Sequence, residues 1–232
     1  TYTEKLWGMS CRDLDSDFAA QRIRKLSLLE VAKNALKLSG KNTHKTLVDQ
    51  FAYPLEGTGM IYERMARSVE QSGGLVRLGS PVRSVVLREG KMVGLAAADG
   101  QEHAFDAVVS TMPLTQLVSG LPNVPGEVAA AADRLRYRNT VLVYLLVDNP
   151  ELFADNWLYI HAAQLDMGRV TNFRNWVPQL NQGRRETILA LEYWCYDQDS
   201  LWHTDDKDII ALATREMEQT GLLKGSPVLD GH

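Results

Sequence analysis

The sequence predicts a mixed α/β (α+β) fold, because helical and extended patterns both recur along its 232 residues. Apolar residues return at helical spacing over 59–72, and the two glycines directly after this range are typical of a helix end. Extended runs over 82–88 and 91–98 flank a Glu-Gly pair, which indicates a hairpin turn. Three more extended runs in series after residue 156 predict an antiparallel sheet that packs with helices.

The first half of the chain predicts two further helices and two further strands. Short helices are expected over 17–25 and 28–38, where apolar residues recur at rough helical spacing. The apolar run 75–78 ends in Gly-Ser-Pro and predicts a short buried strand. A second apolar run, 105–111, ends on Met-Pro and predicts another strand. The middle of the chain is therefore expected to run in the order helix, strand, hairpin, strand.

The second half predicts helices on both sides of a strongly apolar strand. Residues 114–121 and about 125–136 are expected to be helical, and the proline that starts the second range suits a first helical position. The range 139–147 is apolar at nearly every position, so we expect a strand that is covered on both faces. A last helix is expected over 207–222, because two aspartates before it offer an N-cap.

Aromatic and cationic side chains gather on the three extended runs after residue 156. Because alternate residues of a strand share a face, two sets are each expected on one surface: Trp157, Tyr159 and His161, and Arg169, Thr171 and Phe173. Such a surface suits a planar base stacked on aromatic rings, with a guanidinium on a phosphate. Taken alone, the residues favour a structural role instead, in which Arg169 pairs with an acid such as Glu192.

Composition indicates an ordinary globular protein and argues against several function classes. The net charge of −4 gives no reason to expect nucleic acid or an anionic membrane as a partner. No apolar run reaches the roughly 18 residues of a transmembrane segment, and no signal peptide pattern starts the chain, so a cytoplasmic protein is expected. Cys11 and Cys195 are expected to be reduced thiols. The histidines have no metal-ligand spacing and no Gly-x-Ser-x-Gly elbow occurs, so we predict neither a metal site nor hydrolase chemistry.

Four segments of the middle region resemble one known family. They read YPLEGTGMIYERMA, GGLVRLGSPVRSVV, DG and DAVVSTMPL, and their order and spacing are similar to the middle module of the flavin-dependent amine oxidase superfamily. Protoporphyrinogen oxidase-like proteins, carotenoid desaturases and UDP-galactopyranose mutases belong to it. The resemblance implies an FAD cofactor. It also implies that Val82 lies in the strand against the adenosine end of FAD, and that Thr111 and Pro113 form the turn near its flavin side.

Two flavin-binding signatures of that family do not occur in the sequence. No Gly-x-Gly-x-x-Gly is present, and the Gly-Thr-Gly at 57–59 is the closest approach. The second glycine-rich flavin contact, near the family's C-terminus, is missing too. The resemblance therefore implies an internal fragment that alone should not bind FAD stably. It implies substrate-domain helices over 1–48, a partial FAD-binding, Rossmann-like module over 49–120, and a substrate domain with an antiparallel sheet over 121–232.

A segment of the second half resembles one branch of the superfamily more closely. The letters NWLYIH…GRVTNFRNWVP are similar to eukaryotic-type UDP-galactopyranose mutases, with the same Trp-x-Tyr and Arg spacing. This resemblance implies that Trp157 and Tyr159 line a nucleotide pocket and that Arg169 contacts the diphosphate of a sugar nucleotide. Protoporphyrinogen oxidase-like proteins share this stretch as well. Neither resemblance assigns an acid or base role to any residue of the chain.

Three functions follow from these resemblances as expectations. The first is an FAD-dependent oxidoreductase of the amine oxidase or protoporphyrinogen oxidase type, in which a hydride passes from a small-molecule substrate to the flavin. The second is a sugar-nucleotide isomerase of the mutase type, which uses reduced FAD covalently. The third is a non-catalytic binding domain that folds alone and docks a partner.

Overall fold

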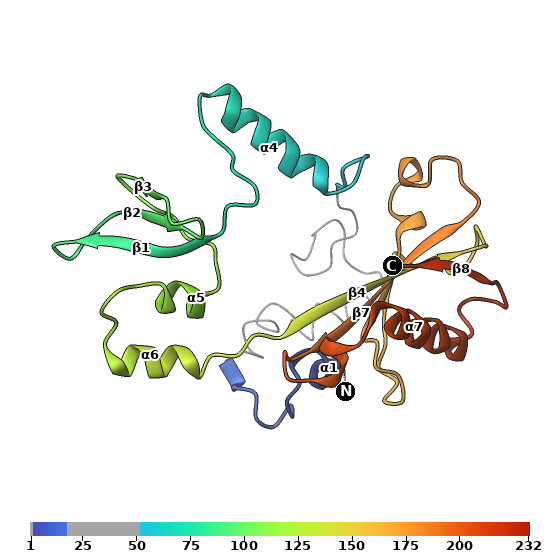
Figure 1. The fold of residues 1–232 in the computed structure, drawn as a ribbon. Coiled ribbons are helices and arrows are strands. Elements are labelled where there is room, and N and C mark those ends of the chain that lie inside the picture. The colour runs from blue at the N-terminus through green and yellow to red at the C-terminus, as the bar shows by residue number, and fades with distance from the viewer. Residues whose placement is uncertain (1, 18–51) are drawn as a thin grey trace, which may run out of the picture. The chain divides into compact units, whose positions relative to one another are not determined.

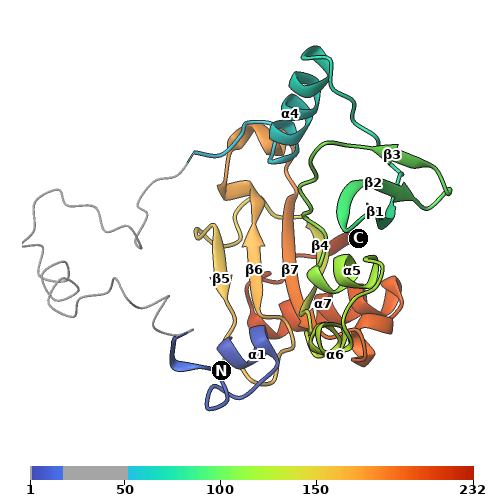
Figure 2. The ribbon, with the colours of Figure 1, turned by 90° about the vertical axis from the view of Figure 1, so that its left-hand side faces the viewer.

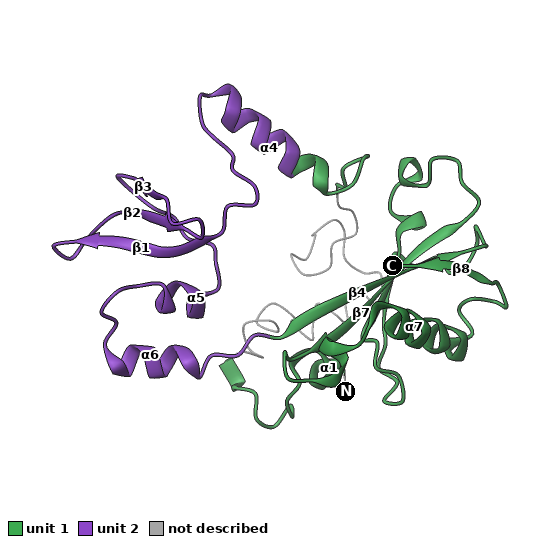
Figure 3. Cartoon of the chain, in the orientation of Figure 1, with its two compact units in different colours: residues 1–61, 138–232 green, residues 62–137 purple. Residues whose placement is uncertain are grey.

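The computed structural model describes residues 2–17 and 52–232 (Figure 1). The chain forms two compact units, one made of residues 1–61 and 138–232 and the other of residues 62–137 (Figure 3). The predicted helix 28–38, and all but the first residue of 17–25, lie outside the described residues. The expected division of the chain into substrate and flavin-binding parts, with boundaries near residues 48 and 120, stays a prediction.

The first unit is built on a five-stranded sheet in the order β5-β6-β7-β4-β8, with every neighbouring pair antiparallel (Figure 2). The three extended runs expected in series are confirmed as β5, β6 and β7, and the apolar run before them is β4. The strands span these residues: β4 Asn139–Val147, β5 Trp157–Tyr159, β6 Arg169–Asn172, β7 Thr187–Cys195 and β8 Val228–Gly231. The predicted antiparallel sheet is therefore present.

One face of this sheet packs against helix α7, Asp206–Thr220. Asp205 is its N-cap residue and Gly221 ends it at φ +71°, a left-handed conformation that glycine adopts without strain. Buried apolar side chains form the core between the sheet and the helix. They include Val143, Leu145, Val147, Val170, Leu189, Leu191, Ile209, Ala213 and Met217. The expectation that β4 is covered on both faces was wrong, because Leu142 on its other face is 46% exposed.

Short elements surround the sheet in the first unit. They are α1 Tyr2–Trp7 and the 3-10 helices η1 Phe173–Asn175, η2 Pro178–Asn181 and η3 Ser200–His203. Helix α4, Gly59–Gln71, confirms the predicted helix in that range and crosses the boundary between the two units.

The second unit contains a three-stranded antiparallel sheet and two short helices. Its elements are β1 Val82–Arg88, β2 Lys91–Ala97, β3 Glu102–Ala104, α5 Leu114–Ser119 and α6 Gly126–Asp133. The predicted hairpin is confirmed: Glu89 and Gly90 connect β1 to β2 with φ values of 52° and 74°. Two positive φ values in a two-residue loop are those of the turns that match the twist of a hairpin.

Two predicted strands of the second unit do not form. The runs 75–78 and 105–111 contain no strand residues, and Leu78 and Val109 are each 90% exposed. A strand requires a neighbouring strand to receive its backbone hydrogen bonds, and no described strand pairs with either run. Apolar composition alone was therefore a wrong guide to these two segments.

Candidate functional site

The face of the five-stranded sheet opposite α7 carries the three side chains expected to bind a substrate, and we call it the open face. Strand register places its members: Trp157 and Tyr159 on β5, Arg169 and Thr171 on β6, Ile188, Ala190, Glu192 and Trp194 on β7, and Leu142, Tyr144 and Leu146 on β4. Tyr159 is 48% exposed, and Ile188 is 43% exposed. The open face is therefore partly accessible and combines aromatic, aliphatic and charged groups.

An ion pair lies at the middle of the open face. Arg169 and Glu192 are direct cross-strand partners, and the Arg169 Nε donates to the Glu192 Oε1 at 2.7 Å. The Arg169 Nη2 contacts the same oxygen atom. Burial disfavours the charged guanidinium, but the hydrogen bond and the charge of Glu192 outweigh this cost and raise the pKa of Arg169. The guanidinium is thus held in its charged form, with the Glu192 carboxylate as its ion-pair partner.

One aromatic group covers the Tyr159 side of the open face. The Tyr2 ring, from α1, lies edge-on to Tyr159 with ring centroids 4.8 Å apart. The same ring lies 5.5 Å from Trp194 and 5.6 Å from His161. Edge-on aromatic pairs at such distances are attractive beyond their buried area. Helix α1 is therefore docked on this part of the sheet by Tyr2.

A second aromatic group lies on the Trp157 side. The Trp176 ring lies 5.8 Å from Trp157, 4.8 Å from Tyr53 and 6.1 Å from Phe173. Phe173 in turn stacks on Tyr144 of β4, with an interplanar angle of 18° and centroids 6.3 Å apart. The rings form a continuous row from β5 to β4.

A pocket of about 390 Å³ opens at the Tyr144 end of this row. Its walls come from the sheet, from η2 and from the segment before β7: Tyr53, Tyr144, Leu146, Phe173, Leu180, Asn181, Gln182, Arg184, Glu186 and Ile188. Pockets that are mainly apolar and carry a few polar groups are typical of small-molecule sites. The arrangement suits a planar group held between rings, with a polar end toward Arg184 and Glu186.

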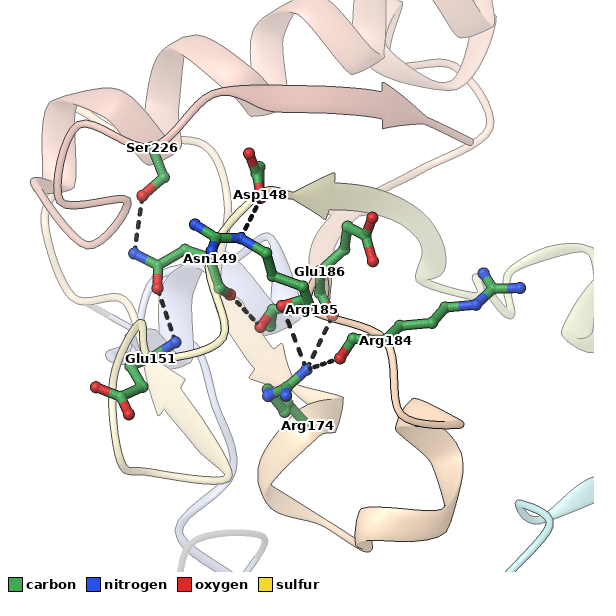
Figure 4. Close-up of polar contacts among 9 residues, drawn as sticks. Asp148, Asn149, Glu151, Arg174, Arg184, Arg185, Glu186 and Ser226 are labelled. Atoms are coloured by element: carbon green, nitrogen blue, oxygen red, sulfur yellow. Dashed lines mark hydrogen bonds and ion pairs between the residues drawn. The ribbon is translucent and has the colours of Figure 1, made fainter.

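The segment that forms one rim of this pocket is fixed by Arg174. Its Nη1 donates to the carbonyl oxygens of Arg184 at 2.9 Å and Glu186 at 3.1 Å (Figure 4). Arg185, between them, donates through Nε to the Asp148 Oδ1 at 2.9 Å. The backbone of the rim is therefore held in place, and Figure 4 shows the Arg184 side chain pointing away from Arg174.

The structure brings the three predicted substrate residues onto one face, but not into this pocket. Trp157 is linked to the pocket through the Trp176 and Phe173 rings. Tyr159 and Arg169 are paired across β5 and β6 and do not line it. The ion pair with Glu192 that the structural role of Arg169 requires is present. A role of these three residues in ligand binding stays a prediction.

The three predicted flavin contacts lie in the second unit and are not gathered in one site. Val82 lines a pocket of about 550 Å³, together with Leu95, Ala97 and the hydrogen-bonded pair Arg77 and His103, whose nitrogens are 3.1 Å apart. Apolar walls beside a guanidinium suit a planar ring that carries an anionic group. Thr111 and Pro113 lie in the exposed segment before α5, with Pro113 as its N-cap residue, and do not line this pocket. Their assignment to FAD also stays a prediction.

Three further properties concern the cysteines, metal binding and membrane-spanning helices. Cys11 is exposed and Cys195 is buried, no disulfide joins them, and burial raises the pKa of the Cys195 thiol. Within residues 2–17 and 52–232, no three side chains of the His, Cys, Asp or Glu type come together as a metal site would require. None of the helices in the described ranges is both long and apolar enough to cross a membrane.

Sequence reasoning missed the residues that other segments bring to the open face. Tyr2 and Tyr53 reach it from more than 80 residues away in sequence, and no local pattern marks them. Tyr144 did carry a signal, because it is the one polar-tipped residue in the apolar run of β4. Its ring stacks on Phe173, which accounts for an aromatic residue at this position.

Comparison with solved structures shows the fold. A reduced UDP-galactopyranose mutase matches 100% of this chain and 50% of its own length, with a TM-score of 0.74 and 16% identity. A protein from Exiguobacterium sp. 255-15 assigned as a protoporphyrinogen oxidase matches 79% of this chain and 39% of its own, with a TM-score of 0.63 and 18% identity. An oxidoreductase from Methanosarcina mazei matches 76% of this chain and 42% of its own, with a TM-score of 0.58 and 15% identity. The chain thus spans half or less of these structures.

Comparison with protein families is more specific than these structural matches. No curated protein sequence gives a significant match. The family model described as flavin containing amine oxidoreductase, however, matches residues 12–224, which is nearly the whole chain. The resemblance that the middle motifs carry is thereby confirmed, and so is the mixed α/β fold with antiparallel sheets. The chain belongs to the flavin containing amine oxidoreductase family.

Proposed function

We propose that the chain supplies the substrate-binding sheet of an FAD-dependent oxidoreductase, in which a hydride passes from a small-molecule substrate to the flavin. The family relationship supports the use of a flavin. The observation that carries the proposal is the open face, where a row of aromatic rings from Trp157 to Tyr144 leads to a mainly apolar pocket. When bound, the flavin supplies the electron-accepting ring, so the protein's task is to bind and orient the substrate.

The residues of the open face are suited to that task. Phe173 and Tyr144 offer ring faces for a planar or aliphatic substrate, and Leu146 and Ile188 exclude water beside them. Arg184 and Glu186 stand on a rim that Arg174 holds rigid, so they can orient a polar end of the substrate. A rigid rim matters because a loosely held polar group positions a reacting carbon poorly.

The Arg169–Glu192 ion pair favours the oxidoreductase over a sugar-nucleotide mutase. A diphosphate carries at least two negative charges and is best bound by an uncompensated guanidinium. Two nitrogens of Arg169, Nε and Nη2, contact the Glu192 carboxylate, which balances the charge of the guanidinium. This arrangement weakens the attraction for a diphosphate and suits a neutral or weakly charged molecule.

The mutase stays the second proposal because two observations favour it. The fold match to the UDP-galactopyranose mutase extends over the whole chain. In addition, the Arg169 Nη1 has no hydrogen bond among the described residues, so it could donate to a phosphate oxygen while Glu192 holds the rest of the group. In that reading, Trp157 would stack on the uracil ring.

The first experiment is a visible absorption spectrum of the complete purified gene product. We expect the bands of an oxidised flavin, and their bleaching under anaerobic conditions by an amine substrate. A colourless, folded protein that takes up no added FAD would contradict both enzymatic proposals and favour a non-catalytic binding domain.

The two enzymatic proposals are separated by ligand titration. The oxidoreductase predicts that UDP has no measurable effect on the flavin spectrum and that Ile188→Arg, which fills the pocket, raises KM for the amine. The mutase predicts UDP binding that Arg169→Gln abolishes. Arg88→Gln serves as the matched control, because Arg88 is an exposed arginine of the second unit with its own carboxylate partner, Glu102.

A further inference from the structure

The connection between β5 and β6 encloses the ammonium group of Lys5. Lys5 belongs to α1, and its Nζ lies 3.3, 2.7, 2.6 and 3.1 Å from the carbonyl oxygens of Ile160, Ala162, Leu165 and Met167. We call these four carbonyl groups the carbonyl cage. An ammonium group has only three protons, so four acceptors exceed what it can satisfy with one linear bond each. Three of the oxygens lie within 3.1 Å of Nζ and the fourth lies at 3.3 Å, so the four oxygens surround one cationic position.

The Leu165 carbonyl is oriented by a partner other than Lys5. The peptide N–H of Asp166 donates to the carboxylate of Glu216 on α7, and no described peptide bond is cis. In a trans peptide the N–H and C=O point in opposite directions, so the Leu165 carbonyl is directed away from Glu216 and toward Lys5. Glu216 is only 4% exposed and also accepts from the Tyr193 hydroxyl at 3.0 Å. Its position is thus fixed by the core.

The Met167 carbonyl is oriented in the same way by the sheet. The peptide N–H of Gly168 donates to the backbone oxygen of Glu192 on β7 at 2.8 Å. The carbonyl of the same peptide, which belongs to Met167, therefore points to the opposite side, where Lys5 lies. Two of the four cage oxygens would keep their direction if Lys5 were removed.

Two nearby carboxylates offset part of the cost of burying a positive charge in the cage. Burial lowers the pKa of Lys5, because desolvation disfavours its charged form. The carboxylates of Glu216 and Asp166 act in the opposite direction and stabilise the cation. Neutral carbonyl oxygens replace the hydration shell of potassium in known selective sites, whereas magnesium requires octahedral geometry and keeps several of its waters.

We propose that the carbonyl cage is a binding site for a monovalent cation of the size of potassium, with the Lys5 ammonium as its resident occupant. A free potassium ion takes the same point when that ammonium is withdrawn. Because the two occupants share one position, binding of the ion and docking of Lys5 exclude each other. The cage then stabilises the β5–β6 connection in either state, and Lys5 adds to the docking of α1 in only one of them.

The test is the thermal stability of the Lys5→Met chain in potassium, sodium and choline chloride at equal ionic strength. Potassium is expected to raise Tm of this variant saturably, by about 3–6 °C at ten times its Kd, and sodium to raise it less. Choline is too large to enter the cage and gives the baseline. The wild-type chain, whose cage is filled by Lys5, is expected to show the same Tm in potassium and sodium.

The matched control is Lys224→Met, because the Lys224 Nζ donates to a single carbonyl oxygen, that of Glu151 at 2.8 Å. This variant should show no selective response to potassium. If Lys5→Met does not fold in sodium or choline, its recovery in potassium alone supports the proposal. Lys5→Gln, which keeps a neutral donor in the cage, is the second variant to measure in that case. Equal Tm values of Lys5→Gln in all three salts, with Lys5→Met equal or unfolded in all three, overturn it.

Discussion

The two units of the chain bury their apolar residues to very different extents. In the first unit, a continuous core between the sheet and α7 contains Leu145, Leu189 and Leu191, all at 0% exposure. In the second unit, only Gly94, Ala97 and Ala132 are buried. The larger apolar side chains of the second unit are half-buried or exposed. The comparison teaches that an apolar run becomes core only where another element provides the opposite side.

The largest expected effect is a matched pair of leucine substitutions, one in each unit. Leu145→Ala should lower the free energy of unfolding by about 2–5 kcal/mol, because it leaves a cavity in a packed core. Leu78→Ala, at a residue that is 90% exposed, should change it by no more than about 0.5 kcal/mol. Urea unfolding of both variants measures the difference. Similar losses for the two would show that Leu78 is packed and would break the comparison.

The same contrast explains which parts of the fold the sequence could predict. The strands β4 and β7 and the helix α7 were predictable, because long periodic patterns and capping residues are local signals. The runs 75–78 and 105–111 were wrong as strands, because pairing depends on a partner that local pattern does not reveal. Where the partner was adjacent in sequence, as in the β1–β2 hairpin, the prediction was confirmed.

The candidate site was predictable only in part, for the same reason. Alternation along β5 and β6 correctly placed Trp157 with Tyr159, and Arg169 with Thr171, because strand periodicity is local. The partner of Arg169 was also anticipated, as Glu192. The contacts of Tyr2 and Tyr53 with the open face depend on chain folding over long separations, and no spacing rule could supply them.

A matched pair of glycine substitutions, one beside the open face and one in α6, compares the packing of the two units. A Cβ added at Gly168 would lie 1.7 Å from Cζ3 of Trp194, so Gly168→Ala must displace this ring. We expect a loss of about 1–3 kcal/mol and a changed near-ultraviolet circular dichroism signal. Gly126→Ala in α6 meets nothing within 4 Å and should be neutral or stabilise the second unit by up to about 1 kcal/mol. An unchanged aromatic signal in Gly168→Ala would mean that Trp194 is not packed there.

A matched pair of arginine substitutions compares the ion pairs of the two units. Arg169→Met leaves the Glu192 carboxylate, on a residue that is 9% exposed, without its partner, and should cost about 1–2 kcal/mol. Arg88→Met removes a pair with Glu102 whose side chains are 75% and 59% exposed, and should cost less than about 1 kcal/mol. Double-mutant cycles with Glu192→Gln and Glu102→Gln give the two coupling energies. The Arg169 coupling should persist in 1 M salt (roughly a 3 Å screening length), whereas the Arg88 coupling should vanish.

The smallest expected effect is a pH dependence that belongs to the core of the first unit. Burial, followed by the charge of Glu216, raises the pKa of Tyr193 above its usual value of 10.0. The folded state therefore keeps this proton to higher pH than the unfolded state, so the stability is complete below pH 10.0 and falls as pH rises beyond it. The expected loss is about 0.8 kcal/mol at pH 10.5, measured as a shift of the urea midpoint. Tyr193→Phe should flatten this fall, although the Cys195 thiol, whose pKa is also raised by burial, contributes in the same direction. Tyr62→Phe in the second unit changes a side chain that is 67% exposed and should leave the fall of stability with pH unchanged. An equal flattening in this variant would show that the pH dependence does not come from the buried core.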